Sequence, residues 1–477
     1  MTETTTNGRT LLERALGLVT EVRRGEAPLA LAMALNVFIL LTAYSVIKPV
    51  REALILGKFA SGAEYKSYMS AAIAVALLAA VPAYARFVDR LPRLRLVVGV
   101  TLFFASHLVI FFIASRVELL RHYMGLVFFV WIGVFNMMVV AQFWAFANDV
   151  YDEEQGKRLF ALVALGASFG AALGSGVAAL LVGPFGVFAP LLVGAALLVV
   201  CAFLFAWSER LSTAFREQQK GAALAATSPG GELKRKERPK GAFALVMRHR
   251  YLFAIALFAL VFSWANSNSE YMLSKLVKAA ANEAVRSGTL PPGMDAGDYI
   301  GLTYAQFNFG VNTLSLLLQG FVVSRIIKHG GVGLGLIVLP IITLMNGVAV
   351  LALPVLAVLR IGKTLENATD YSLNNTARQM LWLPTSYEMK FKAKQAVDTF
   401  FVRLGDVSSS ALVLVGTSLL AWSVRAYAFA NVLLGAVWIF LVWRIRREGR
   451  RLERARPASG EPSTEGAHAI SDVAAEG

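Results

Sequence analysis

Two cations stand at the end of the first apolar run of the chain, in the stretch TAYSVIKPVREALIL. Lys48 and Arg51 are three residues apart, so a helix would place them on one face, and Pro49 between them favours a bend. A charge near the centre of a bilayer costs about 3 kcal/mol or more, and such residues persist where they pair, line water or bind a ligand. Two interpretations remain open: cations that snorkel at the helix end, or an anion clamp that faces a central cavity.

A second polar group lies in the stretch AQFWAFANDVYDEEQGKRLF, where an apolar, aromatic run leads into a charged loop. The charges of the loop are typical of a solvated turn. Asp149 precedes them and lies deepest in the run. Because a carboxylate at that depth is costly unless it pairs or functions, we expect Asp149 to belong to the candidate site.

A third polar group occupies the stretch FSWANSNSEYMLSKLVK, which should lie at membrane depth. Asn266, Asn268, Glu270 and Lys275 fall within ten positions of it. This crowding is the best single indication of a substrate path. Hydrogen bonds between helices, each contributing about 0.6 kcal/mol, are the alternative interpretation.

The longest charged stretch, residues 360–406, mixes cations with carboxylates, so many of its charges are expected to neutralise one another. An interior with spare cations nevertheless suits a phosphorylated anion, because arginine binds phosphate bidentately and lysine binds it as a point charge. Lys392, Lys394 and Arg403 are the candidate substrate ligands in this stretch.

The sequence patterns of enzymes and metal sites give no support to catalysis. The chain has no GxxxxGK[ST] loop and no HExxH, and none of its five histidines is paired at metal-ligand spacing. Its one cysteine, Cys201, excludes a disulfide framework. We therefore expect a protein that is not an enzyme and has no cofactor and no metal, so that any transport would be secondary or facilitated.

The composition identifies the class of protein that must position these residues. Of the 477 residues 57% are apolar, and with the 39 glycines the share rises to about 65%, against about 45–50% in soluble domains. A soluble fold of this length cannot bury so much apolar surface, so we expect an all-α membrane protein. The net charge of +15 is expected in loops and at the C-terminus, where it sets topology and meets lipid headgroups.

Apolar runs of about 20 residues predict twelve transmembrane helices. Their centres lie near residues 35–46, 71–83, 96–113, 126–146, 162–181, 187–205, 253–264, 304–323, 334–353, 353–373, 400–422 and 426–443. Three segments are basic: the link between the second and third spans, the link between the sixth and seventh, and the part after the last span. They lie on one side of the membrane only if the number of spans is even. The positive-inside rule then predicts that both termini are cytoplasmic.

The same pattern predicts two six-helix halves. We expect a cytoplasmic N-terminal segment at residues 1–27 and six-helix halves at 28–207 and 251–444. A basic cytoplasmic linker at 208–250 would separate the halves, and a basic, then disordered cytoplasmic tail would follow at 445–477. In the link ARFVDRLPRLRL, Asp89 and the arginines after it resemble the pattern of major facilitator transporters. The expected fold is therefore all-α and major facilitator-like, with twelve transmembrane helices in two halves.

Three stretches resemble those of the plastid and intracellular-parasite ATP/ADP translocases: KPVREALIL, FWAFANDVYDEEQGKRLF and YSLNNTARQMLWLPTSYEMKFKAKQAVDTFFVRLG. The third is the most specific, because it combines a proline after an apolar triplet with a K-x-K-x-x-x-D run. The resemblance implies a twelve-span, facilitator-like antiporter that exchanges nucleotides without metal chemistry of its own.

In that family two lysines and two glutamates of the translocation path matter for transport. By the motifs, Arg51 stands at the first lysine, Asp149 at the first glutamate, Glu270 at the second, and Lys394 or Lys392 at the last lysine. All four positions keep the sign of the charge, but the first two change residue type. Arginine in place of lysine alters phosphate geometry, so another nucleotide, inorganic phosphate or an unrelated organic anion stays open as the substrate.

The leading hypothesis is a secondary transporter of nucleotides or another phosphorylated anion that works by alternating access. Arg51 and Lys394 would hold phosphates, and Asp149 and Glu270 would pair with these cations in the empty state. Two alternatives stay open: a proton-coupled transporter of a small organic solute or drug, and a non-transporting membrane component. We expect a monomer in the bacterial inner membrane, whose partners are its substrate and lipids and not nucleic acid.

Overall fold

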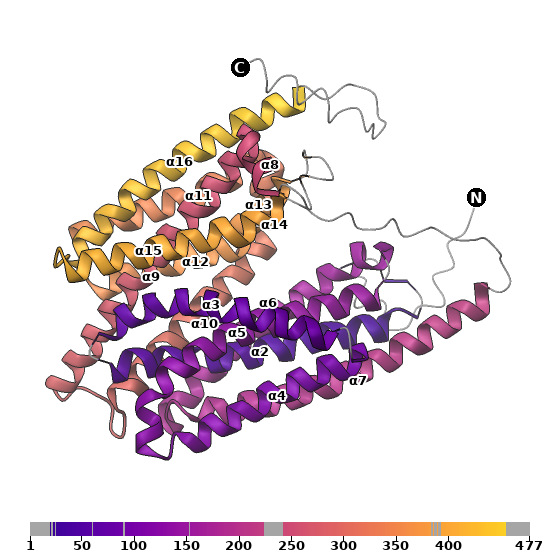
Figure 1. Ribbon diagram of the computed structural model, residues 1–477, viewed down its shortest axis with the longest axis horizontal. Coiled ribbons are helices and arrows are strands. Elements are labelled where there is room, and N and C mark those ends of the chain that lie inside the picture. Colours follow the sequence, from indigo (N-terminus) through magenta and orange to yellow (C-terminus); the bar gives the residue numbers. More distant parts are fainter. Residues whose placement is uncertain are drawn as a thin grey trace. The chain divides into compact units, whose positions relative to one another are not determined.

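The structure is a computed structural model, and its described residues form helices and no strands (Figure 1). It describes residues 20–223, 242–382 and 393–454, apart from short gaps at 21, 24, 60, 89–90 and 152, together with residues 385 and 389. Asp89, Lys392, residues 224–241 of the expected linker and residues 455–477 of the expected tail lie outside the described residues.

Long apolar helices dominate both halves of the chain. The first half forms α2 (Ala27–Lys58), α3 (Gly62–Val88), α4 (Arg93–Ala114), α5 (Glu118–Val150), α6 (Glu153–Phe185) and α7 (Ala189–Ala223). The second half begins with α8 (Ala242–Arg248), α9 (Arg250–Arg286), α10 (Ala296–Phe321), α11 (Val323–Ala352) and α12 (Leu356–Thr369). It continues with the π-helical turn η1 (Asp370–Asn374), α13 (Asn375–Met380), α14 (Lys394–Ala396), the π-helical turn η3 (Val397–Phe401), α15 (Val402–Ser418) and α16 (Val424–Arg454).

Eight helices of the described chain are long and apolar enough to cross a membrane: α2, α4, α5, α6, α7, α9, α11 and α16. The other four expected spans fall in α3, in α10, in α12 with η1, and in α15. These segments are helical but do not meet the same criterion of length and hydropathy. The helical membrane fold is therefore confirmed, and the number twelve stays a prediction.

The chain forms two compact units that do not follow the two sequence halves. Unit 1 comprises the described residues of Met1–Ala60, Ala72–Leu233 and Ala281–Asn312. Unit 2 comprises those of Ser61–Ala71, Lys234–Ala280 and Thr313–Gly477. The first turns of α3 thus belong to the unit built mainly from the second half, and the start of α10 belongs to the unit built mainly from the first.

In unit 1, α2 is the central helix and packs against α5, α6 and α7. Three glycines of α6, spaced four residues apart, allow its close approach to α2. A Cβ atom at Gly166, Gly170 or Gly174 would lie 2.5, 2.2 or 2.4 Å from a carbonyl oxygen of α2, closer than real Cβ atoms come. Small residues at this spacing are typical of tightly packed membrane helices.

In unit 2, α11 packs against α16 and α12, and α9 contributes a second face of the core. The ring of Trp438 on α16 lies 5.5 Å from that of Phe258 and 5.6 Å from that of Phe262, both on α9. Such aromatic contacts fix the rotation of α9, and with it the direction of the polar side chains further along that helix.

Candidate functional site

The two cations of α2 lie in the interior of unit 1. Lys48 Nζ donates a hydrogen bond to Oδ1 of Asn308 on α10, at 3.1 Å. Arg51 is 17% exposed; its Nε donates to Glu52 Oε1 at 2.9 Å, and its Nη2 bonds to the same oxygen. The Arg51 guanidinium also lies 4.8 Å from the centroid of the Phe129 ring on α5. Both cations are therefore held by polar or aromatic partners within the protein.

Asp149 lies far from Arg51. Arg51 contacts Phe129, and Asp149 is 20 residues further along the same continuous helix, which corresponds to about 30 Å. Asp149 is 61% exposed and pairs with Arg93 Nη1 of α4 at 3.4 Å; Arg93 also pairs with Glu209. The expectation that Asp149 lies deep and pairs with Arg51 in the empty protein is wrong for this conformation, because the carboxylate stands at the end of α5.

Glu270 has a partner that the sequence analysis missed. Its Oε1 accepts a hydrogen bond from Lys66 Nζ at 2.7 Å, and the same ammonium donates to Ser274 Oγ at 3.0 Å. Lys66 is on α3 but belongs to unit 2, and its side chain is 7% exposed. Lys66 lies before the expected second span, where a lysine is normally assigned to a loop. Only the contact between α3 and α9 shows that it is the partner of Glu270.

Asn266 and Asn268 have different environments, although they are two residues apart. Asn266 accepts hydrogen bonds from Lys363 Nζ, at 2.7 Å through Oδ1 and at 3.2 Å through its backbone oxygen. Asn268 is fully buried, and its Nδ2 donates to the Tyr427 backbone oxygen at 3.0 Å and to Asn431 Oδ1 at 2.7 Å. Both N–H donors of Asn268 thus join α9 to α16, and its role in substrate binding stays a prediction.

Lys363 and Glu366 form a buried ion pair on α12, with 3.4 Å between Lys363 Nζ and Glu366 Oε2. Their side chains are 0% and 4% exposed, and Asn346 of α11 donates to Glu366 Oε1 at 2.8 Å. The expected neutralisation of charges within residues 360–406 is confirmed for this pair. Removing one member of such a pair would leave a buried charge without compensation, so either single substitution should destabilise unit 2.

The candidate ligands near the C-terminal end of this stretch also have partners. Lys394 Nζ donates to Gln379 Oε1 at 2.6 Å. Arg403 pairs with Asp406 at 3.2 Å, and the same carboxylate accepts a hydrogen bond from Ser267 at 2.9 Å. Arg403 is therefore attached to the face of α9 that carries Ser267.

Lys275 lines an open cavity of about 530 Å³ in unit 2. Its Nζ lies 3.4 Å from the Tyr271 hydroxyl, which donates a hydrogen bond to Glu64 Oε1 at 3.0 Å. The wall of the cavity combines this ammonium and carboxylate with the aromatic rings of Tyr65, Tyr68 and Trp422. The mixture of charges and rings can accept a polar aromatic solute.

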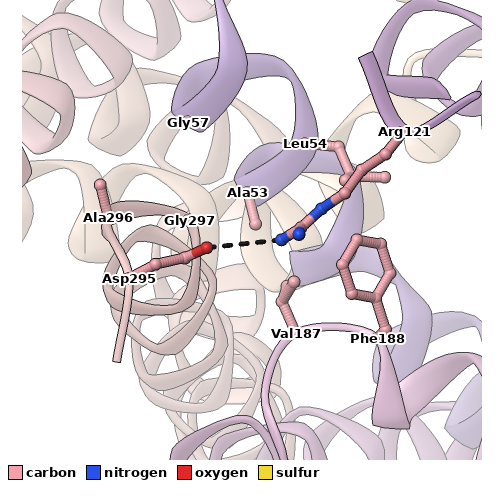
Figure 2. A pocket seen from close by; sticks show the side chains of 9 residues that line it. All are labelled: Ala53, Leu54, Gly57, Arg121, Val187, Phe188, Asp295, Ala296 and Gly297. Carbon is pink, nitrogen blue, oxygen red and sulfur yellow. Dashed lines mark hydrogen bonds and ion pairs between the residues drawn. The ribbon is translucent and has the colours of Figure 1, made fainter. Parts of the chain in front are cut away.

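A second cavity, of about 220 Å³, lies in unit 1 beside the ion pair of Arg121 and Asp295, whose charged atoms are 3.5 Å apart (Figure 2). Nearby, Asp298 accepts a hydrogen bond from the Val187 backbone at 2.8 Å, and burial raises the pKa of Asp298 above its usual range. None of the predicted substrate ligands lines this cavity. Its polar groups join the start of α10 to the turn between α6 and α7.

Potential metal ligands do not cluster within the described part of the chain. No group of three His, Cys, Asp or Glu side chains there could hold a metal ion. The pentapeptide GASFG at 166–170 matches the GxSxG pattern, but it lies inside α6, and Ser168 Oγ bonds to the Ala164 backbone oxygen at 3.2 Å. In α/β-hydrolases the serine of this pattern lies on a strand-to-helix turn instead.

Comparison with protein families gives two matches. The model of the Major Facilitator Superfamily matches residues 33–382, and that of the TLC ATP/ADP transporter matches residues 337–448. The second region contains Lys363, Lys394 and Arg403. Both matches agree with the resemblance that the sequence motifs predicted.

Two curated relatives are named as carriers of ADP and ATP. The "ADP,ATP carrier protein 1" of Chlamydia pneumoniae is 25% identical over 368 residues, which cover 68% of this chain and 67% of the carrier. The protein of the same name from Chlamydia trachomatis is 24% identical over 368 residues, with 69% and 65% covered. The chain spans about two thirds of the length of these relatives.

Solved structures share the fold at low sequence identity. A bacterial homologue of the human lysosomal transporter Spinster, in an inward-facing and unoccupied conformation, is 12% identical, with 93% of this chain and 100% of that chain covered and a TM-score of 0.52. The nucleoside transporter NupG is also 12% identical, with 88% and 98% covered and a TM-score of 0.56. The chain belongs to the Major Facilitator Superfamily, and its resemblance to the ATP/ADP translocases is confirmed.

Proposed function

We propose that the protein is a secondary transporter that exchanges ATP, ADP or a similar nucleotide across a membrane by alternating access. The observation that carries this proposal is the pair of cations on α2, Lys48 and Arg51, both held by partners inside unit 1. Interior charges of a membrane protein pair with one another, line water or bind a ligand, and an anionic substrate would use two cations on one helix. The ATP/ADP transporter match and the names of the two carriers indicate which anion that is.

The chemistry of the two cations fits a polyphosphate. The Arg51 guanidinium is planar and can donate two parallel hydrogen bonds to a phosphate, while the Lys48 ammonium acts as a point charge beside it. In this structure Arg51 bonds to Glu52. We propose that a phosphate competes with this carboxylate, so that substrate binding exchanges one charged partner of Arg51 for another.

Unit 2 supplies further candidate ligands. We propose that Lys275 and Lys394 bind the substrate at different stages of the cycle, because their described partners are neutral oxygens of Tyr271 and Gln379. A neutral acceptor is replaced by a phosphate more readily than a carboxylate is. Glu270 pairs with Lys66, and we propose that this contact holds α9 in place when the substrate is absent.

The remaining properties follow from this function. We propose that the protein lies in the bacterial inner membrane as a monomer with both termini in the cytoplasm, and that it has no enzymatic activity. The basic C-terminal part of α16 would then contact anionic lipid headgroups, because its arginines follow the last apolar run directly.

Ligand binding to the purified full-length protein tests the proposal. At about one hundred times the dissociation constant, ADP or ATP should add about 2.7 kcal/mol to the free energy of unfolding and so raise the melting temperature. The shift should be lost in Arg51→Gln and reduced in Arg51→Lys, which retains the charge but not the two parallel hydrogen bonds. Arg116→Ala is the matched control, since Arg116 also lies over a phenylalanine ring, Phe112 at 5.0 Å, but is exposed.

Two outcomes would contradict the proposal. If neither ADP nor ATP shifts the melting temperature of the wild-type protein, the nucleotide is not its substrate. If the shift persists in Arg51→Gln at the same ligand concentration, the α2 cation does not bind the phosphates.

A further inference from the structure

A buried amide next to Lys48 has a donor that no described residue satisfies. Asn308 of α10 is 4% exposed, and its Oδ1 accepts the hydrogen bond from Lys48 Nζ at 3.1 Å. Its Nδ2 is buried and has no hydrogen-bond partner among the residues that the structure describes. The great majority of buried polar side-chain atoms have a partner, so this one requires an explanation.

The chemistry of lysine fixes the orientation of the amide. An ammonium group has three donors and no acceptor, so the atom of Asn308 that faces Lys48 must be the oxygen. The Nδ2 donor therefore points away from the Lys48 ammonium, and rotating the amide by 180° would bring two donors together. The unsatisfied donor is consequently a property of this position.

The next turn of α10 provides a contrast. Asn312 is four residues further along, and its Nδ2 donates to the Ala171 backbone oxygen at 3.0 Å and to Ser175 Oγ at 2.9 Å, both on α6. The same residue type on the same helix is thus fully used for packing. Helix packing accounts for Asn312, but it leaves the donor of Asn308 unexplained.

We propose that Asn308 Nδ2 donates a hydrogen bond to a phosphate oxygen of the transported anion, beside the ammonium of Lys48. This inference rests on the proposed function, because it names a further ligand of the same substrate. A phosphate oxygen is an acceptor and carries negative charge, so it satisfies the amide donor and the ammonium together. Lys48 binds any anion as a point charge, whereas the oriented amide adds a direction that favours an acceptor oxygen.

The test replaces the donor while keeping the acceptor. Asn308→Asp retains an oxygen for Lys48 and substitutes a second oxygen for Nδ2. We expect the dissociation constants for ADP and for inorganic phosphate, measured on the purified full-length protein, to rise about 10- to 100-fold. The melting temperature without ligand should stay at or above the wild-type value, because Lys48 gains a charged partner.

Asn312→Asp is the matched control. It removes the donor to Ala171 and Ser175, so it should lower the melting temperature without ligand and leave both dissociation constants within about twofold of wild type. The two variants therefore separate a ligand contact from a packing contact. If Asn308→Asp does not fold, Asn308→Ala decides, since it removes the donor without adding a charge and should also weaken binding.

The outcomes distinguish this inference from the proposed function. If the wild-type protein binds ADP and the Asn308 variants bind it equally well, the inference is wrong and the proposed function stands. If the wild-type protein binds neither ADP nor inorganic phosphate, both are wrong. The inference is supported if Asn308→Asp weakens binding without lowering the ligand-free melting temperature, while Asn312→Asp lowers that temperature without weakening binding.

Discussion

At the scale of single residues, the ion pair of Lys66 and Glu270 joins α3 to α9 within unit 2. The two charged atoms are 2.7 Å apart, and the side chains are 7% and 28% exposed. A lysine so well buried keeps its charge only with a partner. The pair therefore holds the first turns of α3 on α9.

Neutralising one member of this pair should lower the stability more than exchanging the two charges does. We expect Lys66→Met to lower the free energy of unfolding by about 1–3 kcal/mol and to slow nucleotide exchange, because Glu270 loses its partner. The double variant Lys66→Glu with Glu270→Lys should regain most of the stability, measured by thermal unfolding in detergent.

The exposed pair of Glu283 and Arg286 provides the control, since its side chains are 63% and 75% exposed. Arg286→Met should change the free energy of unfolding by less than about 1 kcal/mol. A double variant of Lys66 and Glu270 that is no more stable than Lys66→Met would show that the pair does not stabilise the protein.

Sequence reasoning identified the charged positions better than their directions. Asn266 and Glu270 are four residues apart and share one face of α9, whereas Asn268 lies about 200° from Asn266 around the helix. That periodicity could have separated Asn268, which faces α16, from the other two. The partner of Glu270 could not be predicted, because Lys66 is 204 residues away in the chain.

At the scale of elements, the contact between α2 and α6 depends on glycines. Gly166, Gly170 and Gly174 form a row in which each α-carbon faces a carbonyl oxygen of α2. The row follows the spacing GxxxGxxxG, which can be read from the sequence and is typical of closely packed membrane helices.

A methyl group in this row should push the two helices apart. We expect Gly170→Ala to lower the free energy of unfolding by about 1–3 kcal/mol, because its Cβ would lie 2.2 Å from the Phe38 backbone oxygen. Gly99→Ala on α4 is the control: a Cβ there has nothing within 4 Å, and alanine favours a helix by about 1 kcal/mol. Equal melting temperatures for the two variants would contradict this account of the packing.

The apolar pattern predicted the long helices well and the interrupted ones poorly. The eight membrane-length helices of the described chain each contain an expected span. The segment after residue 356 differs, because α12 passes into the π-helical turn η1, where Asn374 donates to Asp370 at 2.8 Å. Such a turn depends on individual hydrogen bonds that a count of apolar residues does not contain.

At the scale of the whole molecule, the two compact units regroup segments of the two sequence halves. The sequence predicted the halves from the basic linker and from the numbers of spans on either side of it. The hydrogen bond of Lys48 with Asn308 keeps the start of α10 in unit 1, and that of Lys66 with Glu270 keeps the start of α3 in unit 2. These contacts join residues more than 200 positions apart, so the pattern of apolar runs could not predict them.

The regrouped contacts involve the residues that we propose for transport. In our proposal Lys48 and Asn308 bind the phosphate, and in the structure Glu270 is paired with Lys66. A substrate that replaces one of these hydrogen bonds would release α10 from Lys48 or α3 from Glu270. We propose that this release couples substrate binding to alternating access.

The most direct test of the central claim is nucleotide exchange in reconstituted vesicles. Labelled ADP should enter vesicles loaded with ATP and should not accumulate in empty vesicles, with or without a pH gradient. Arg51→Gln should abolish this uptake, and Arg116→Ala should leave it unchanged. Uptake into empty vesicles that follows a pH gradient, or no uptake of ADP under any loading, would contradict a nucleotide antiporter.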